Sequence, residues 1–169
     1  GNKLTMNQIK NELFEEYKKY LTEYGKKIVD ILILEGKKTL GDQVHGEIIS
    51  FASLIYTDKY FLTTLDLWLL VTKYEIPTIF ICQKWILQTK YEKHEMVGYG
   101  NKEDKFAFIL LPGFGPEKIP KYKLIKSNDG EVFISLDKLN GECLDRIYNL
   151  FDDVMVIENY LKHFTKPKK

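Results

Sequence analysis

The sequence predicts an α+β domain, α/β-like in kind, in which helices pack on a small central sheet of about four to five strands. Two observations predict this class. Residues 5–72 carry apolar side chains at spacings of three and four, which is typical of amphipathic helices. Residues 78–82 and 105–111 are runs of apolar, β-branched and aromatic residues without polar alternation, as in strands covered on both faces.

A long N-terminal helix is predicted over residues 5–34. Thr5 followed three residues later by Gln8 is a capping-box start, and Gly36 is a left-handed stop. Gly25 is a position at which this helix can kink or divide. Its apolar face consists of Ile9, Leu13, Phe14, Tyr17, Leu21, Tyr24, Ile28, Ile31 and Leu32.

Two further helices are expected before the first strand. One covers residues 40–54, with its start marked by Thr39. The next is short, is capped by Thr63 or Thr64 and continues through Thr72. Pro77 then forces an extended entry into the strand at 78–82.

The second half of the chain is predicted to complete the sheet. Residues 84–91 fit either a strand or a helical turn, and the polar stretch 92–104 is expected to be a loop. Residues 122–126 and 131–136 flank an Asp129-Gly130 pair, which favours a hairpin turn with positive φ. Two short helices, over residues 140–150 and 153–164, are expected to close the chain before a basic tail.

Composition excludes several classes of protein. With 44% hydrophobic and 14% aromatic residues, the chain can bury a core, so disordered and collagen-like classes are excluded. Twenty-five basic against 24 acidic side chains give a net charge of +1, which favours neither nucleic acid nor an anionic membrane. The lone arginine and abundant Ile, Asn, Tyr and Lys suggest an AT-rich genome. We expect a single domain over residues 1–169 that belongs to a longer protein, because the chain starts at Gly1 without an initiator Met.

The histidines do not form an obvious catalytic or metal site. His45 shares a predicted helix face with Asp42, and a surface or capping role is favoured over a ligand role. His94 lies in a charged stretch and His163 near the tail, so both are expected to be solvated. No metal or cofactor is therefore assigned.

Neither cysteine fits a protease nucleophile, which must be held as a thiolate. Cys82 ends a predicted buried strand, where a thiol usually fills space. Cys143 has acidic neighbours, Glu142 and Asp145, which disfavour the thiolate. The thiols suggest a reducing compartment, and no catalytic residue is assigned.

Two segments of the chain carry a distinctive order of elements. The first is an aromatic-led loop and an aliphatic helix, residues 60–70, followed by the strand approach at 76–81. The second is the strand at 108–111, a bend, and residues 120–124. Both segments resemble the ovarian-tumour (OTU) cysteine-protease fold, in particular the divergent OTU-like domains of giant DNA viruses. The resemblance implies an OTU-like core over residues 37–136, between an N-terminal helix (1–36) and C-terminal helices with a basic tail (137–169).

The sequence departs from this family at the residues that perform catalysis. The Asp-Gly-Asn-Cys motif that carries the OTU nucleophile is missing, and Lys121 stands where the resemblance places the catalytic histidine. Lysine cannot replace an imidazole as the base for a thiol. The resemblance therefore implies an OTU-like scaffold without protease chemistry.

The leading hypothesis is a catalytically inactive OTU-like domain that acts as a protein-interaction or structural module. Its partner would be ubiquitin or a viral protein, in the host cytoplasm or the virion, and not a membrane. The expected contact surface is the bend at residues 112–120, including Phe114, with Lys121 and Tyr122. Tyr60 and Trp85 are further candidates, because Tyr and Trp are enriched at interfaces.

Two alternatives remain open. An OTU-type deubiquitinase would take its nucleophile from outside this sequence, and an Asp-Gly-Asn-Cys motif upstream in the parent protein would identify it. A weak, sequence-independent nucleic-acid binder would use the lysines, and its affinity would fall steeply with salt. The near-neutral charge disfavours nucleic acid as a partner.

Overall fold

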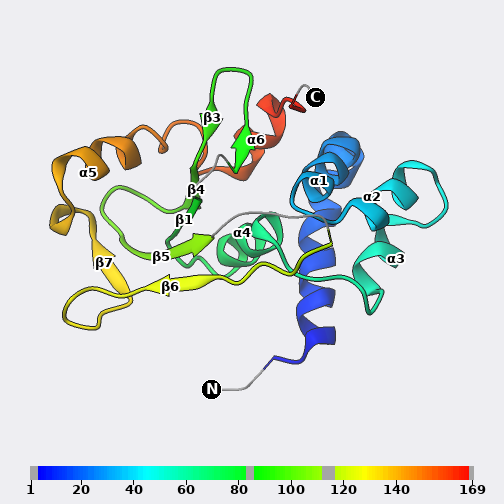
Figure 1. Ribbon diagram of the computed structural model, residues 1–169, viewed down its shortest axis with the longest axis horizontal. Helices are drawn as coiled ribbons and strands as arrows, with labels where there is room; N and C mark the ends of the chain where they lie inside the picture. Colours follow the sequence, from blue (N-terminus) through cyan, green and yellow to red (C-terminus); the bar gives the residue numbers. More distant parts are fainter. Residues whose placement is uncertain (1–3, 83–85, 112–116, 168–169) are drawn as a thin grey trace. The chain divides into compact units, whose positions relative to one another are not determined.

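The computed structural model describes residues 4–82, 86–111 and 117–167, which form two compact units. The first unit contains residues 4–70 and 117–119, and the second contains residues 71–82, 86–111 and 120–167. The predicted α+β class is confirmed: a long N-terminal helix and further helices accompany a five-stranded mixed sheet (Figure 1). Within the described residues, no helix combines the length and apolar character needed to cross a bilayer.

Helix α1, Met6–Leu34, is the longest element of the first unit. The capping box predicted from Thr5 and Gln8 is present, and Gly36 adopts a φ of 108° after the helix ends. The predicted irregularity near Gly25 is found at its neighbour Tyr24, whose φ of −120° and ψ of 15° interrupt the helical geometry. The buried face includes Leu13, Tyr17, Ile28, Ile31 and Leu32, each at most 1% exposed.

The prediction of a single helix over residues 40–54 is wrong. The chain forms α2, Lys38–His45, and α3, Phe51–Tyr56, instead. Glu47 has a φ of 58°, which lies outside the right-handed helical region, so α2 cannot continue through this residue. The Ser50 side chain then caps α3 by accepting a hydrogen bond from the Ser53 amide. The apolar spacing continued across this break, so the pattern alone did not reveal it.

Helix α4, Thr64–Lys73, agrees with the predicted third helix, and its residues 64–70 belong to the first unit. In the second unit, β1 (Thr78–Cys82) and β5 (Lys105–Leu111) confirm the two strongest strand predictions and pair in parallel. Strand β4, Met96–Tyr99, pairs antiparallel with the other edge of β1. Short strands β2, Leu87–Gln88, and β3, Lys93–His94, form a separate two-stranded sheet.

The loop expected over residues 92–104 is therefore wrong, because it contains β3 and β4. Met96, Val97 and Gly98 are buried in the central sheet although charged residues precede and follow them. Four residues are too few for a clear sequence period, and this strand is specified by its pairing with β1.

Strands β6, Lys123–Ile125, and β7, Phe133–Ser135, do not form the predicted hairpin. Both pair antiparallel with β5: Ile125 lies opposite Phe108, and Phe133 lies opposite the adjacent Ala107. They are consecutive halves of one edge strand, interrupted by the loop at 126–132 (Figure 1). The predicted turn itself is present inside this loop, where Gly130 has a φ of 80°.

The remaining elements follow β7. A short 3₁₀ turn, η1 (Leu136–Lys138), leads to α5, Gly141–Tyr148, whose N-cap Asn140 accepts a hydrogen bond from the Cys143 amide. Helix α6, Ile157–His163, is shorter than the predicted 153–164. Phe164 then forms an antiparallel bridge with Thr89, so the chain beyond α6 lies beside β2.

Gly98 allows the backbone of β4 to lie close to β1. A methyl group on Gly98 would be 2.3 Å from the Thr78 carbonyl oxygen, and backbone cannot move aside as a flexible side chain can. We expect Gly98→Ala to lower the free energy of unfolding by about 1–3 kcal/mol in urea denaturation. Gly141→Ala in α5 is the matched control, since nothing lies within 4 Å of its added methyl group. Equal stability of the two variants would contradict this account.

Candidate functional site

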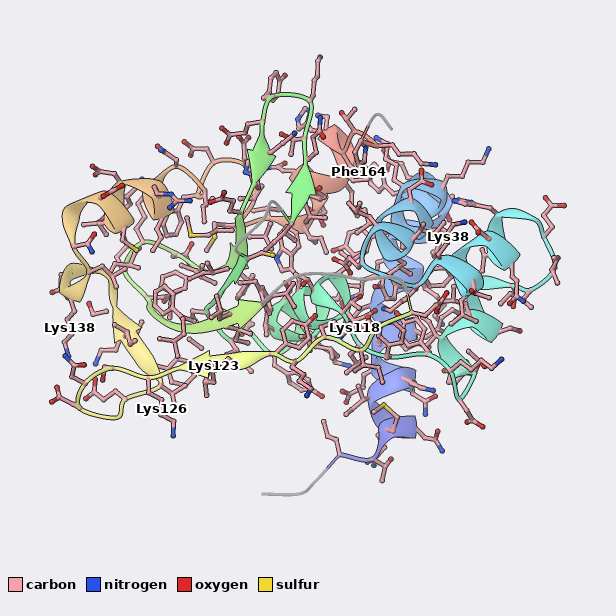
Figure 2. All side chains as sticks on the ribbon, in the orientation of Figure 1. Lys38, Lys118, Lys123, Lys126, Lys138 and Phe164 are labelled. Carbon is pink, nitrogen blue, oxygen red and sulfur yellow. The ribbon has the colours of Figure 1, made fainter. Side chains whose placement is uncertain are left out.

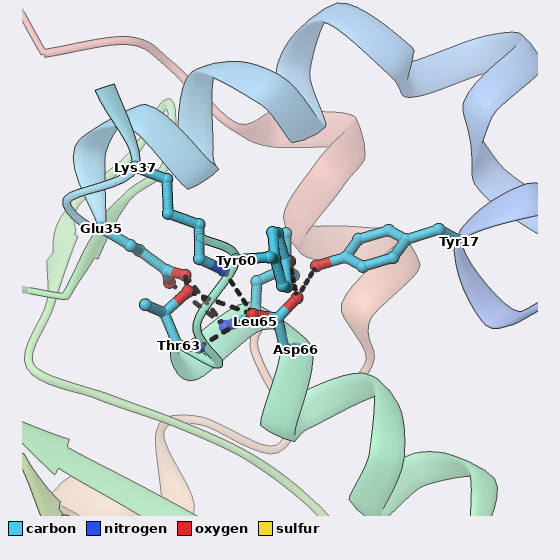
Figure 3. Close-up of polar contacts among 7 residues, drawn as sticks. All are labelled: Tyr17, Glu35, Lys37, Tyr60, Thr63, Leu65 and Asp66. Carbon is cyan, nitrogen blue, oxygen red and sulfur yellow. Dashed lines mark hydrogen bonds and ion pairs between the residues drawn. The ribbon is translucent and has the colours of Figure 1, made fainter. Parts of the chain in front are cut away.

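The first unit contains a buried network of polar side chains, drawn in Figure 3. Its members come from α1, from the segment that follows α1, and from the loop and first turn that begin α4. Most are fully inaccessible to solvent, and Tyr60 is 6% exposed. The side chains are Tyr17, Glu35, Lys37, Tyr60, Thr63 and Asp66.

Two carboxylates of the network cap the N-terminus of α4. Asp66 accepts a hydrogen bond from the Thr63 amide at 2.8 Å, and both oxygens of Glu35 accept from the Leu65 amide at 3.2 Å. The first amides of a helix have no partner within the helix, and carboxylates are favourable there because the positive end of the helix dipole faces them. The Thr63 hydroxyl donates to Glu35 at 2.6 Å.

Asp66 is the centre of the network. It accepts hydrogen bonds from the hydroxyls of Tyr17, at 2.7 Å, and Tyr60. Lys37 Nζ lies 2.5 Å from Asp66 Oδ2 and 4.0 Å from the centre of the Tyr60 ring. The buried ammonium therefore has both an anionic partner and an aromatic face, which offset the loss of its hydration.

Burial dominates the electrostatics of the network. It raises the pKa of Glu35 from 4.5 to about 7, although the charge of Lys37 and the hydrogen bond from Thr63 act in the opposite direction. Burial likewise lowers the pKa of Lys37, opposed by Asp66 and Glu35. The pKa values of Tyr17 and Tyr60 are raised well above 10, first by burial and then by the charge of Asp66.

These contacts give the network a structural role. Its charged groups are 0% exposed, and the hydrogen bonds of Asp66 and Glu35 go to groups of the same unit. A substrate would have to displace these partners to reach either carboxylate. The network fixes the start of α4 against α1, which defines a single arrangement of this unit.

The second unit has a cavity of about 610 Å³, lined by residues 92–96 and by Arg146, Asn149 and Leu150. Arg146 Nη2 lies 2.5 Å from Glu95 Oε2, and both side chains are about half exposed. Met96 and Leu150 are buried among the lining residues. The cavity thus combines an apolar part with an ion pair that is already formed.

The expectation that His94 is solvated is wrong. It is 3% exposed, with Nε2 3.3 Å from Thr89 Oγ1 and Nδ1 3.5 Å from Glu92 Oε1. Burial lowers its pKa from the ordinary 6.5, opposed by the charges of Glu92 and Asp153, and so favours the neutral ring. Both ring nitrogens have polar neighbours within the β2–β3 sheet and its turn, which explains how an imidazole is buried in a charged stretch of sequence.

The other candidate residues lie apart from this cavity or are engaged elsewhere. His45 Nε2 is 2.9 Å from Asp30 Oδ1, and the ring of His163 lies 5.7 Å from that of Tyr91. Cys82 is buried, as predicted, and Cys143 is partly exposed in the first turn of α5. Among the described residues, no three His, Cys, Asp or Glu side chains are grouped to hold a metal ion.

The predicted binding residues fall in different places. Tyr60 is a core residue of the first unit, in the buried network. Lys121 is exposed and Tyr122 is half-buried, just before β6 in the second unit. Phe114 and Trp85 lie outside the described residues.

Glu35, Lys37 and Asp66 were not among the residues predicted from the sequence to form a site. The one available signal was Asp66, a carboxylate within the otherwise apolar run from Leu65 to Leu70. Aspartate is almost never fully buried without a partner, so that position called for a cation or several donors nearby. Nothing in the local sequence distinguishes Lys37, which is buried, from Lys38, which is exposed.

Comparisons with known proteins give no relative for this chain: no family model, no curated protein and no solved structure matches it.

Proposed function

We propose that this chain is a non-catalytic, OTU-like protein-binding module, and that its contact surface lies at the outer edge of the sheet in the second unit. The observation that carries the proposal is a pair of large apolar side chains exposed at this edge. Leu124 in β6 is 43% exposed and Phe133 in β7 is 45% exposed.

The two side chains lie on the same face of the sheet. Leu124 is opposite Ile109, and Phe133 is opposite Ala107, two residues away along β5. Residues two apart on a strand share a face, and so do residues directly opposite each other. Adjacent apolar side chains with polar residues around them are typical of protein-interaction sites.

In the chain, β6 comes directly after Lys121 and Tyr122, two residues that were predicted from the sequence to take part in binding. Ubiquitin is the partner to test first, because the resemblance to OTU proteases suggests it; a viral protein is the alternative. The buried network of the first unit supports a binding rather than a catalytic role, because its acids and its base are closed to solvent.

We expect the double substitution Leu124→Asp and Phe133→Asp to weaken partner binding by at least about tenfold, since it places charges at the centre of the contact. The measurement is capture of partners by the immobilised chain, followed by calorimetric titration with ubiquitin. Ile48→Asp is the matched control, since Ile48 is 73% exposed in the first unit. Circular dichroism verifies that each variant is folded.

Capture that is unchanged by the double substitution, or equally reduced by Ile48→Asp, would contradict this surface. Covalent labelling by a ubiquitin-based cysteine probe would contradict the non-catalytic role, and Cys82 and Cys143 would then be the residues to replace.

A further inference from the structure

We propose that β6 receives an extended, acidic segment of a partner protein, which adds to the sheet as a further strand. This inference rests on the proposed function and specifies the chemistry of the partner. Its basis is the combination of an open strand edge, β6, with one lysine in the strand, Lys123, and two beside its ends, Lys121 and Lys126.

The outer edge of β6 is open among the described residues. Strand β5 lies on one side of β6, and no described segment pairs with the other side. The opposite edge of the sheet differs, because the Gly98 amide of β4 donates to the Val154 carbonyl at 3.1 Å. An unpaired edge leaves backbone donors and acceptors available to an extended segment.

The open edge is strongly basic. Lys121, Lys123 and Lys126 are all exposed, and residues 120–126 contain no acidic side chain. Figure 2 shows Lys123 on β6 and Lys126 just beyond it. Lys123 lies opposite Leu110 and Leu124 opposite Ile109, so the lysine and the exposed leucine occupy opposite faces of the sheet.

These two faces define the incoming segment. In a strand added beside β6, alternate side chains would lie on the Lys123 face and on the Leu124 face. Acidic residues suit the first face and aliphatic residues the second. A segment in which Glu or Asp alternates with Val or Ile therefore matches the edge.

A second copy of this chain is a poor occupant, because pairing β6 with β6 would bring the same lysines together. Single-stranded nucleic acid is also disfavoured. Such sites combine cations with arginine or with a series of stacking aromatic rings, whereas the only arginine, Arg146, is paired with Glu95, and Phe133 is the one aromatic residue of β6 and β7. Leu124 offers an apolar contact that a phosphate backbone does not use.

The test measures binding of a fluorescent peptide in which Glu alternates with Val, by anisotropy with the full chain. Three control peptides isolate the causes: Gln in place of Glu, the same composition with all Glu residues grouped at one end, and backbone N-methylation at alternate residues. A single-stranded oligonucleotide serves as the competing ligand. We expect the alternating acidic peptide to bind at least about tenfold more tightly than each control peptide.

The matching protein variant is Lys121→Glu with Lys123→Glu and Lys126→Glu, which should abolish binding of the acidic peptide. A control with the same change in charge, Lys26→Glu with Lys59→Glu and Lys102→Glu, replaces exposed lysines elsewhere and should retain it. If both variants lose binding of the acidic peptide equally, the binding depends on net charge and not on the β6 edge, and the proposal is overturned. Undiminished binding of the N-methylated peptide would overturn strand addition, and tighter binding of the oligonucleotide would overturn the protein partner.

The two proposals can fail separately. If Leu124→Asp with Phe133→Asp abolishes partner capture while no acidic peptide binds, the contact surface stands and strand addition is wrong. If the acidic peptide binds at β6 while the double substitution leaves partner capture unchanged, strand addition stands and the proposed contact surface is wrong.

Discussion

Asp66→Ala is expected to lower the free energy of unfolding by about 3–5 kcal/mol, the largest effect of any single substitution considered for this protein. The substitution leaves the Lys37 ammonium 0% exposed without its anion, and removes the acceptor of the Tyr17 and Tyr60 hydroxyls. It also removes the acceptor of the Thr63 amide at the start of α4. Urea denaturation followed by fluorescence measures the loss.

Asp42→Ala is the matched control, because Asp42 is also ion-paired with a lysine, Lys38 at 2.6 Å, but on the surface. Surface pairs contribute at most about 1 kcal/mol, so this variant should be close to the wild type. Combining Lys37→Met with Asp66→Asn removes both charges and keeps an acceptor for the tyrosines. It should be more stable than Asp66→Ala, and equal stability of all these variants would show that the network carries no stability.

Stability is expected to fall by roughly 3 kcal/mol as the pH rises from about 4.5 to about 7 through the titration of Glu35. Its pKa of about 7 in the folded protein lies above the ordinary 4.5, so the folded state binds this proton more tightly than the unfolded state. Protonation therefore favours folding below the folded pKa. That advantage is lost as the pH rises through the folded pKa and the buried carboxyl ionises.

Glu35→Gln isolates this effect, since the amide oxygen can still accept from Leu65 while the side chain no longer titrates. The difference in unfolding free energy between wild type and variant should shrink or reverse across this pH range. His94 acts in the opposite direction, because its lowered pKa makes stability rise with pH, but it does so in both proteins. A pH-independent difference would show that Glu35 does not titrate between pH 4.5 and 7.

The sequence predicted elements that depend on long local patterns. Helix α1 with its Thr5 cap, strands β1 and β5, and the Asn140 start of α5 follow from spacing and capping residues within a few positions of each other. The break between α2 and α3 was within reach too, since Ser50 is a good N-cap. However, the apolar residues keep a helical spacing across the break, and this longer pattern favoured a continuous helix over the N-cap signal of one serine.

Features fixed by distant partners were not predictable in this way. Glu35 and Asp66 meet at the start of α4 although they are far apart in sequence, and the burial of His94 depends on the pairing of β2 with β3. The Asp129-Gly130 pair correctly indicated a turn. The residues of a turn do not determine whether the two flanking strands pair with each other or with a third strand. Here both strands pair with β5.

The interrupted edge strand bears on how this protein can vary in length. Because β6 and β7 resume the same register on β5, the loop at 126–132 can grow without displacing either half. Doubling such a loop costs only about 0.6 kcal/mol of closure entropy. This position is therefore where an affinity tag, a reporter domain or an evolutionary insertion is best tolerated, and where new sequence would emerge directly beside the basic edge.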